Sequence, residues 1–365
     1  MSAAVGWNTF LKVAQSFLWW NPGAFQNPVN ERGYSCRFTR VHDNIFLQAQ
    51  QQGNAKAIRD PFNPPVEYGN VFSAQDPTLG PTLLGLPQDQ TQPPLLVGDF
   101  DGDGTDDVFL ATGAAWYYSS GGQAEWRYLN RMPEHASDVL LGDFDGDGRT
   151  DVIALHGSKG GNIDVSWAGV SAWQTINVTA WPLSDLAVGD FDGDGRSDLL
   201  LATGKQWFFA SGGRNWVPFV VNTGDYSDTI PNLRFGHFTD KTKTQILRVL
   251  NHRWEVTEWG SDSWVDIGPA PVDSVTGLVA GDFDGHGYTE LARSSLFQWQ
   301  YTSPGHGSSW ASLGWATSPL QSRPIGNFLG GAQDGVITWS NNNFYYTHTT
   351  GSQSTSQLLS RQVMR

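Results

Sequence analysis

Short apolar and aromatic runs, separated by polar turns rich in glycine, cover most of the chain. The first clear set lies at residues 95–97, 107–112, 116–120 and 125–129, with Gly113 and Gly121 in two of the turns. Brief runs of this composition, bounded by glycine and other turn-forming residues, are typical of β-strands. The pattern therefore predicts a unit of four short strands.

The same order of runs recurs along the chain. A glycine precedes the first polar turn of every unit, and these glycines are separated by 44, 47, 47, 45 and 45 residues: Gly98, Gly142, Gly189, Gly236, Gly281 and Gly326. Repeats of short strands at this period are typical of a β-propeller, whose blades are four-stranded sheets. The fold class predicted is thus all-β, with six repeat blades in residues 95–365.

Residues 1–94 show no clear repeat. They contain strand-like runs, and residues 38–41 and 45–48 are predicted to form a hairpin around the turn at His42, Asp43 and Asn44. We expect this segment to supply a divergent blade plus lead-in loops, which gives a seven-bladed propeller. Closure with six blades is the alternative.

In three units the first polar turn carries acids at positions 1, 3, 5 and 9, counted from the residue after the glycine. Position 7 offers a backbone carbonyl. The residues at positions 1, 3, 5, 7 and 9 are Asp99, Asp101, Asp103, Thr105 and Asp107; Asp143, Asp145, Asp147, Arg149 and Asp151; and Asp190, Asp192, Asp194, Arg196 and Asp198. Alternate positions of a tight loop can direct oxygens at one centre, and Ca²⁺ takes six to eight oxygen ligands. Three calcium sites are predicted.

The remaining units depart from this pattern. At Gly281 the turn keeps Asp282, Asp284 and Glu290 but has His286 at position 5, which leaves a fourth calcium site open. At Gly236 and Gly326 none of the alternate positions is acidic. Because the repeat survives without these acids, we expect the metal to stabilise individual loops rather than to dictate the fold.

The acidic loops resemble the FG-GAP (VCBS-like) repeats of integrin α-chain propellers and of many bacterial and fungal extracellular proteins, some of which are sugar-binding propeller lectins. The resemblance covers residues 95–365. It implies that the D-x-D-x-D-G-x-x-D loop joins the first two strands of a blade and binds calcium through the three acidic sets given above. It also implies an extracellular or cell-surface location.

The net charge and the sequence motifs exclude several classes of partner and function. The formal net charge is −14, which argues against nucleic acid and anionic membrane surfaces as partners. No apolar run is long enough for membrane insertion, and residues 1–6 lack the features of a signal peptide. The single cysteine, Cys36, excludes an intramolecular disulfide. No catalytic motif occurs, so no catalytic residue is predicted.

The predicted strand order places the acidic loops on one rim and the linkers between blades on the other. These linkers are polar and carry the candidate ligand-binding residues Trp181, Tyr226, His135, Asp138, Asp185 and Asp228. Aromatic faces beside polar side chains suit sugars, so the leading hypothesis is a non-enzymatic lectin that binds glycans. One alternative is a protein-interaction scaffold, an adhesin or toxin-complex subunit. The other is a polysaccharide-active lyase or hydrolase. The regular tryptophans are predicted to pack between blades.

Overall fold

The structure is a computed structural model that describes residues 95–361, except 124, 158–160, 220–226, 262, 296–297, 316–318, 341–342 and 351–352. In the N-terminal segment it describes six short strands: β1 (Ala4–Val5), β2 (Thr9–Leu11), β3 (Arg40–His42), β4 (Ile45–Leu47), β5 (Val66–Tyr68) and β6 (Val71–Ser73). Tyr226, one of the candidate ligand-binding residues, lies outside the described part.

The N-terminal strands form two parallel three-stranded sheets, ordered β1-β3-β5 and β2-β4-β6. The predicted hairpin is wrong, because β3 and β4 belong to different sheets. A hairpin requires antiparallel neighbours. Instead of pairing with each other across the turn at Asp43, β3 pairs with β1 and β5, and β4 pairs with β2 and β6. The register of such short strands is set by few residues, so a local turn pattern is a weak predictor of their partners.

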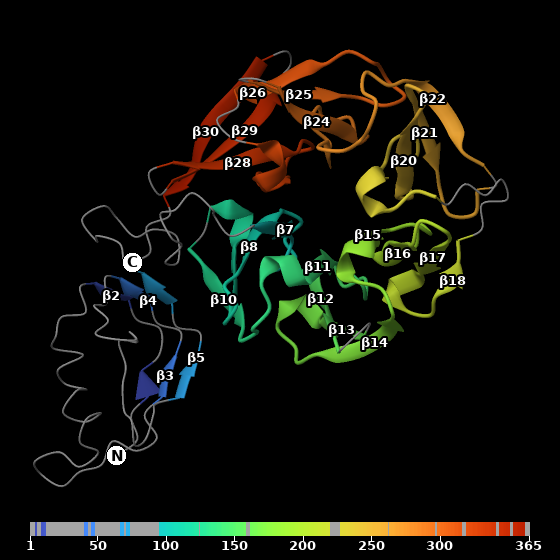
Figure 1. Cartoon of the computed structure of the whole chain (residues 1–365). Coiled ribbons are helices and arrows are strands. Elements are labelled where there is room, and N and C mark those ends of the chain that lie inside the picture. The colour runs from blue at the N-terminus through green and yellow to red at the C-terminus, as the bar shows by residue number, and fades with distance from the viewer. Residues whose placement is uncertain are drawn as a thin grey trace, which may run out of the picture.

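Residues 96–361 form six four-stranded antiparallel blades, which surround a common centre in Figure 1. Blade 1 comprises β7 (Leu96–Gly98), β8 (Asp107–Ala111), β9 (Trp116–Ser119) and β10 (Arg127–Asn130); blade 2, β11 (Val139–Gly142), β12 (Asp151–His156), β13 (Gly161–Ser166) and β14 (Gln174–Thr179); blade 3, β15 (Leu186–Gly189), β16 (Asp198–Ala202), β17 (Trp207–Ala210) and β18 (Val217–Pro218). Blade 4 comprises β19 (Arg234–Gly236), β20 (Gln245–Leu250), β21 (Arg253–Thr257) and β22 (Val265–Pro269); blade 5, β23 (Val279–Gly281), β24 (Glu290–Ser295), β25 (Gln298–Thr302) and β26 (Ala311–Trp315); blade 6, β27 (Ile325–Gly326), β28 (Gly335–Ser340), β29 (Asn343–Thr350) and β30 (Gln353–Arg361). The predicted units and their strand order are confirmed.

The ring closes directly between blades 6 and 1. One buried cluster contains Val108 and Tyr117 of blade 1 together with Phe328 and Tyr346 of blade 6. Across the same seam the Asp106 backbone N–H donates to the Asn327 carbonyl at 3.0 Å. The prediction of seven blades is therefore wrong and six-bladed closure is correct, because blades 1 and 6 pack directly against each other.

Tryptophans fill the junctions between blades, as predicted. The third-strand residues Trp116, Trp207, Trp254 and Trp299 are at most 1% exposed. Trp173, which directly precedes β14 of blade 2, packs edge-on against Trp116 of blade 1, with ring centroids 5.5 Å apart. Trp264 of blade 4 packs in the same way on Trp207 of blade 3, at 5.8 Å. Edge-to-face pairs of this kind stabilise by about 0.5–1.5 kcal/mol beyond the apolar area that they bury.

A hydrogen bond repeated six times joins successive blades. The backbone N–H of position 8 in one blade donates to the carbonyl of position 1 in the blade before it, at 2.6–3.0 Å. The pairs are Thr150–Asp99, Ser197–Asp143, Thr244–Asp190, Thr289–His237, Asp334–Asp282 and Asp106–Asn327. In several blades the side chain of position 8 also accepts a hydrogen bond from the backbone N–H of position 1. One example is Thr289 Oγ1, which accepts from the His237 N–H at 2.8 Å.

This close approach explains the repeated glycines. A Cβ at Gly98 would lie 2.6 Å from Thr150 Cγ2, and one at Gly236 would lie 2.6 Å from Thr289 Cγ2. Both distances are shorter than Cβ atoms show in proteins. The glycines that mark each repeat are thus required by blade docking, whether or not the following loop is acidic.

Candidate functional site

The position 1 carboxylate shapes each acidic loop. Asp99 Oδ1 accepts from the Gly102 N–H at 2.7 Å, and Oδ2 accepts from the Gly104 N–H at 2.8 Å. Gly102 and Gly104 have φ of 76° and 81°, values that glycine adopts without strain. Asp143 and Asp190 make the same pairs of bonds. The glycines therefore let the chain turn back onto this carboxylate.

The position 9 carboxylate is buried and ties two loops together. Asp107 Oδ2 accepts from the Phe100 N–H at 2.8 Å, while Oδ1 accepts from the Gly121 N–H at 2.9 Å in the turn η3 (Ser120–Gly122). Asp151 and Asp198 make the equivalent bonds in blades 2 and 3. Burial raises the pKa of Asp107, Asp151 and Asp198 to about 7.

Each loop gathers three carboxylates around one point. Ligand oxygens lie within 4.8 Å of one another in the sets Asp99, Asp101, Asp107; Asp143, Asp145, Asp151; Asp190, Asp192, Asp194; and Asp282, Asp284, Glu290. Asp101 Oδ1 is buried and has no hydrogen-bond partner among the described residues. A buried carboxylate oxygen without a donor is unfavourable unless a cation compensates it. The donor sets therefore fit a metal ion, and all of their side-chain ligands are oxygens.

Positions 5 and 7 play a different part in blades 1 and 2. Asp103 Oδ1 accepts from the Thr105 N–H, and Asp147 Oδ1 accepts from the Arg149 N–H, so both carboxylates close Asx-type turns outside the clusters. The Arg149 guanidinium donates to the Phe100 carbonyl of blade 1 at 2.8 Å. In blade 3 Asp194 joins the cluster and also pairs with Arg196. Metal binding through the carbonyls of position 7 stays a prediction.

The loops of blades 4 and 5 show how the ligands change. In blade 5 the predicted residues Asp282, Asp284 and Glu290 do come together, although His286 Nδ1 lies 2.7 Å from Asp284 Oδ1. Burial raises the pKa of Glu290 to about 8. In blade 4 the neutral Gln245 takes position 9 and its Oε1 accepts from the Phe238 N–H at 3.1 Å. An amide thus preserves the turn where the charge is lost.

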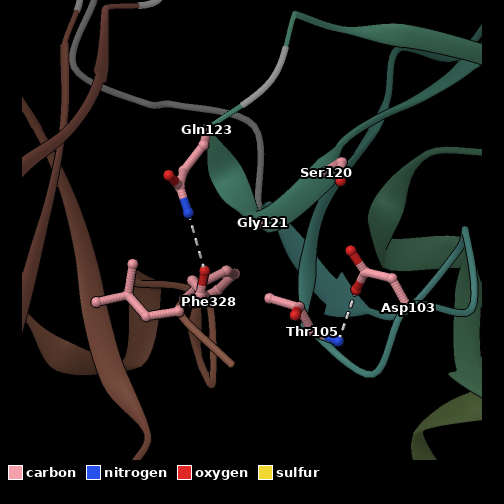
Figure 2. A pocket seen from close by; sticks show the side chains of 7 residues that line it. Asp103, Thr105, Ser120, Gly121, Gln123 and Phe328 are labelled. Carbon is pink, nitrogen blue, oxygen red and sulfur yellow. Dashed lines mark hydrogen bonds between the residues drawn. The ribbon is translucent and has the colours of Figure 1, made fainter. Parts of the chain in front are cut away.

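A hollow of about 370 Å³ lies on this rim at the seam between blades 1 and 6. Figure 2 shows Gln123 reaching across it to the Phe328 carbonyl, a hydrogen bond of 3.3 Å, beside Asp103 and Thr105. The hollow is open, and the Gln123–Phe328 hydrogen bond adds to the contacts that close the ring between blades 6 and 1.

On the opposite rim the predicted ligand residues lie at separate blade junctions. His135 and Asp138 belong to the junction of blades 1 and 2, and they bond to each other in one turn, since the His135 N–H donates to Asp138 Oδ2. Trp181, 41% exposed, and Asp185 lie at the junction of blades 2 and 3. Asp228 pairs with Arg248. The structure does not bring these residues into one common pocket.

Sequence reasoning missed a charged cluster at the junction of blades 1 and 2. His156 Nδ1 lies 2.8 Å from Asp164 Oδ2, and Nε2 lies 3.1 Å from Glu134 Oε1. The ring also packs edge-on against Trp173, at 4.8 Å between centroids. Asp164 and Glu134 stand 8 and 22 positions from His156, a spacing that is not typical of a ligand pair, so the fold was needed to reveal the cluster.

Comparison with known proteins agrees with the geometry. The sequence pattern that defines the FG-GAP-like repeat matches residues 99–154 and 143–201, which include the first three acidic loops. The chain is a β-propeller with FG-GAP-like repeats at residues 99–201. Among curated protein sequences, none matches it.

Two solved structures share the fold of this FG-GAP-like propeller. One is a lectin of Agrocybe aegerita, described as recognising non-reducing terminal N-acetylglucosamine, with 15% identity, a TM-score of 0.51, and coverage of 75% of this chain and 81% of the lectin. The other is the Tc holotoxin pore of Photorhabdus luminescens, with 15% identity, a TM-score of 0.50, and coverage of 74% of this chain but 14% of that one. At this identity the likeness concerns the fold alone. Within the described residues of the FG-GAP-like propeller, no helix has the length and apolar character to cross a membrane.

The contacts of His156 predict a pH-dependent contribution to the stability of the propeller. Burial alone would lower the pKa of His156, but the hydrogen bonds and charges of Asp164 and Glu134 raise it above its usual value near 6.5. The stabilisation is complete below pH about 6.5 and is lost as pH rises through the folded-state pKa. His156→Gln should therefore lower the melting temperature more at acidic than at alkaline pH. Melts of both proteins across pH 5.5–8.5 or so check this, and an equal difference at every pH would contradict it.

Proposed function

We propose that this FG-GAP-like propeller is a calcium-stabilised lectin that acts outside the cell or at a cell surface. It binds glycans through the rim opposite the acidic loops. The role proposed is binding rather than catalysis, because no catalytic motif is identified in the sequence.

The acidic clusters support calcium as the ion. Their side-chain donors are carboxylate oxygens, which suit hard cations such as Ca²⁺ rather than zinc or copper. The clustered carboxylates would hold it: positions 1, 3 and 9 in blades 1 and 2, positions 1, 3 and 5 in blade 3, and Asp282, Asp284 and Glu290 in the fourth site. The other predicted ligands, namely Asp103, Asp147, Asp198 and the carbonyls of Thr105, Arg149 and Arg196, would complete the sites by small shifts of the loops. The bound ion would fix the loops that dock neighbouring blades.

One observation carries the lectin proposal: polar and charged groups beside tryptophans recur at several blade junctions on the opposite rim. Trp173 lies beside His156, Trp264 beside Arg248, and Trp310 beside Arg293. Weak sites repeated around a ring gain avidity on a polyvalent surface. The recognition of N-acetylglucosamine described for the Agrocybe aegerita lectin, which has the same fold, makes a sugar the first ligand to test.

A glycan array probed in the presence of Ca²⁺, followed by isothermal titration, tests this function. We expect binding to at least one glycan class, weakened severalfold by Trp181→Ala because this side chain is 41% exposed at a junction. Val265→Ala, at an exposed position on the outer strand of blade 4, serves as the matched control and should bind normally. Absence of any glycan binding by the calcium-loaded protein would refute the proposal.

A protein-interaction scaffold is the second candidate. The propeller shares its fold with part of a Tc holotoxin, and its outer strands expose Val178 (60%) and Val265 (53%). In this case residues 1–94 would act as a docking element beside the propeller. A stoichiometric protein partner, recovered by crosslinking and lost on deletion of residues 1–94, would favour it over the lectin.

A further inference from the structure

Blades 4 and 5 place an arginine at the same point of the second strand. Arg248 and Arg293 each lie three residues after position 9 of their loop, Gln245 and Glu290. Each pairs in register with the residue that follows a buried third-strand tryptophan, Glu255 or Gln300. Each guanidinium also stacks on the tryptophan that directly precedes the fourth strand of its blade, Arg248 on Trp264 at 4.0 Å and Arg293 on Trp310 at 3.7 Å. The two sites are therefore matched copies.

At Arg248 the protein supplies its own anions. Arg248 Nε lies 2.9 Å from Glu255 Oε2, and a terminal nitrogen lies 3.1 Å from Asp228 Oδ2. The Asp228 carbonyl also accepts from Trp207 Nε1 at 3.0 Å. One linker residue thus satisfies both the arginine and the tryptophan of this junction, and the Arg248 side chain is only 7% exposed.

At Arg293 those acceptors are missing. The strand partner is the neutral Gln300, whose Oε1 lies 3.4 Å from the guanidinium, and no carboxylate of the described residues pairs with Arg293. Its Nε is buried without a hydrogen-bond partner there. Trp254 Nε1, the counterpart of Trp207 Nε1, likewise has no acceptor among the described residues. Two donors at one junction thus lack the acceptors that the neighbouring junction provides.

The linker explains the difference. Asp273 stands eight residues before Gly281, as Asp228 stands eight before Gly236. Its carboxylate faces outward instead, 84% exposed and 2.7 Å from His252 Nδ1. Only nine residues separate β22 from β23, whereas fifteen separate β18 from β19. The shorter linker leaves Arg293 half-buried, without the acid that covers Arg248.

We propose that the junction of blades 4 and 5 binds the anionic group of an acidic sugar, a carboxylate or sulfate ester, on Arg293. This rests on the proposed glycan-binding function and specifies a ligand class for one site. The stacked guanidinium is held in place by Trp310, and its planar fork matches a carboxylate or sulfate. Gln300 stands beside it and can bond a neighbouring hydroxyl. The junctions at Trp173 and Trp264 already contain their own carboxylates, on His156 and Arg248, so they favour neutral sugars.

Titration of the full chain with Ca²⁺ present tests the proposal, using glucuronate, glucose 6-sulfate and neutral glucose as probes. We expect at least one charged probe to bind more tightly than glucose, and Arg293→Gln to weaken it about tenfold or more, as the loss of a charge-assisted contact implies. Gln300→Glu would supply the internal carboxylate that blade 4 has, so it should abolish binding of the charged probe without lowering the melting temperature. Arg253→Gln removes an exposed arginine that pairs with Asp266 and should leave binding unchanged.

The outcomes separate the two proposals. Binding of the charged probes that is equal in the wild type, Arg293→Gln and Gln300→Glu overturns the assignment of this site. If neutral sugars bind but neither charged probe is preferred, this inference fails while glycan binding stands. If no sugar of either kind binds, on the array or in titration, both fail. Preference for glucuronate over the sulfate identifies the carboxylate as the recognised group, and the reverse identifies the sulfate ester.

Discussion

Calcium at about a hundred times its dissociation constant is expected to stabilise the folded protein by about 2.7 kcal/mol per occupied site. For a domain of this size that corresponds to a rise in melting temperature of roughly 5 °C per site. The reason is that each cluster exists only when strand, loop and next strand are folded, as with Asp99, Asp101 and Asp107. Thermal melts in calcium and in EDTA measure the difference.

The variant Asp101→Asn separates the effect of calcium binding on the melting temperature from the effect of the substitution itself. Asp101 Oδ1 makes no hydrogen bond that the substitution would remove, and its negative charge lies beside those of Asp99 and Asp107. Its other oxygen, Oδ2, forms a 3.6 Å ion pair with the largely exposed Arg127 guanidinium. In EDTA the variant should melt close to the wild-type temperature, since the relief of the repulsion among the carboxylates offsets the loss of the exposed ion pair with Arg127. In calcium it should melt below the wild type, because one site is lost.

Asp240→Asn is the matched control for that variant. Asp240 lies in the loop of blade 4, where no cluster forms, and its carboxylate accepts from the Thr242 N–H at 2.8 Å. Its response to calcium should equal that of the wild type. An identical melting temperature of the wild type in calcium and in EDTA would show that the clusters do not bind the ion.

The repeat period and the acidic spacing were sufficient to predict the blades and the loop clusters. The number of blades was not predictable in this way, because closure depends on whether Phe328 of the last repeat can pack against Val108 and Tyr117 of the first. That contact joins residues more than two hundred positions apart and leaves no local pattern. The strand-like runs before residue 95 therefore suggested a blade that the described strands do not form.

Part of the candidate site could be predicted from the sequence and part could not. The acids at positions 1, 3 and 9 can be recognised from their regular spacing. The position 8 residues that dock the blades are harder to recognise, because they vary between aspartate, serine and threonine. Aligning the repeats on their glycines would have exposed both position 8 and the matched pair Arg248 and Arg293. Whether an arginine keeps an internal carboxylate depends on how a linker such as 270–278 turns, and the sequence does not specify that.

Gly236→Ala is expected to destabilise the protein by about 3 kcal/mol, in the upper part of the range for overpacked sites. The melting temperature should fall by roughly 5 °C. The added Cβ would lie 2.6 Å from Thr289 Cγ2, in the place where the Thr289 N–H docks on the His237 carbonyl at 2.8 Å. Because blade 4 has no acidic cluster, the loss should be the same in calcium and in EDTA.

Gly307→Ala is the control that isolates steric overlap from the general effect of replacing glycine. Nothing lies within 4 Å of a Cβ built at Gly307, and its φ is not in the left-handed region. This variant should be neutral or more stable by about 0.4–1 kcal/mol, through reduced entropy of the unfolded chain. Equal effects of the two substitutions would mean that close docking does not require the repeat glycines. A loss confined to Gly236→Ala would instead show that the ring depends on backbone contact between blades, which operates even where no metal can bind.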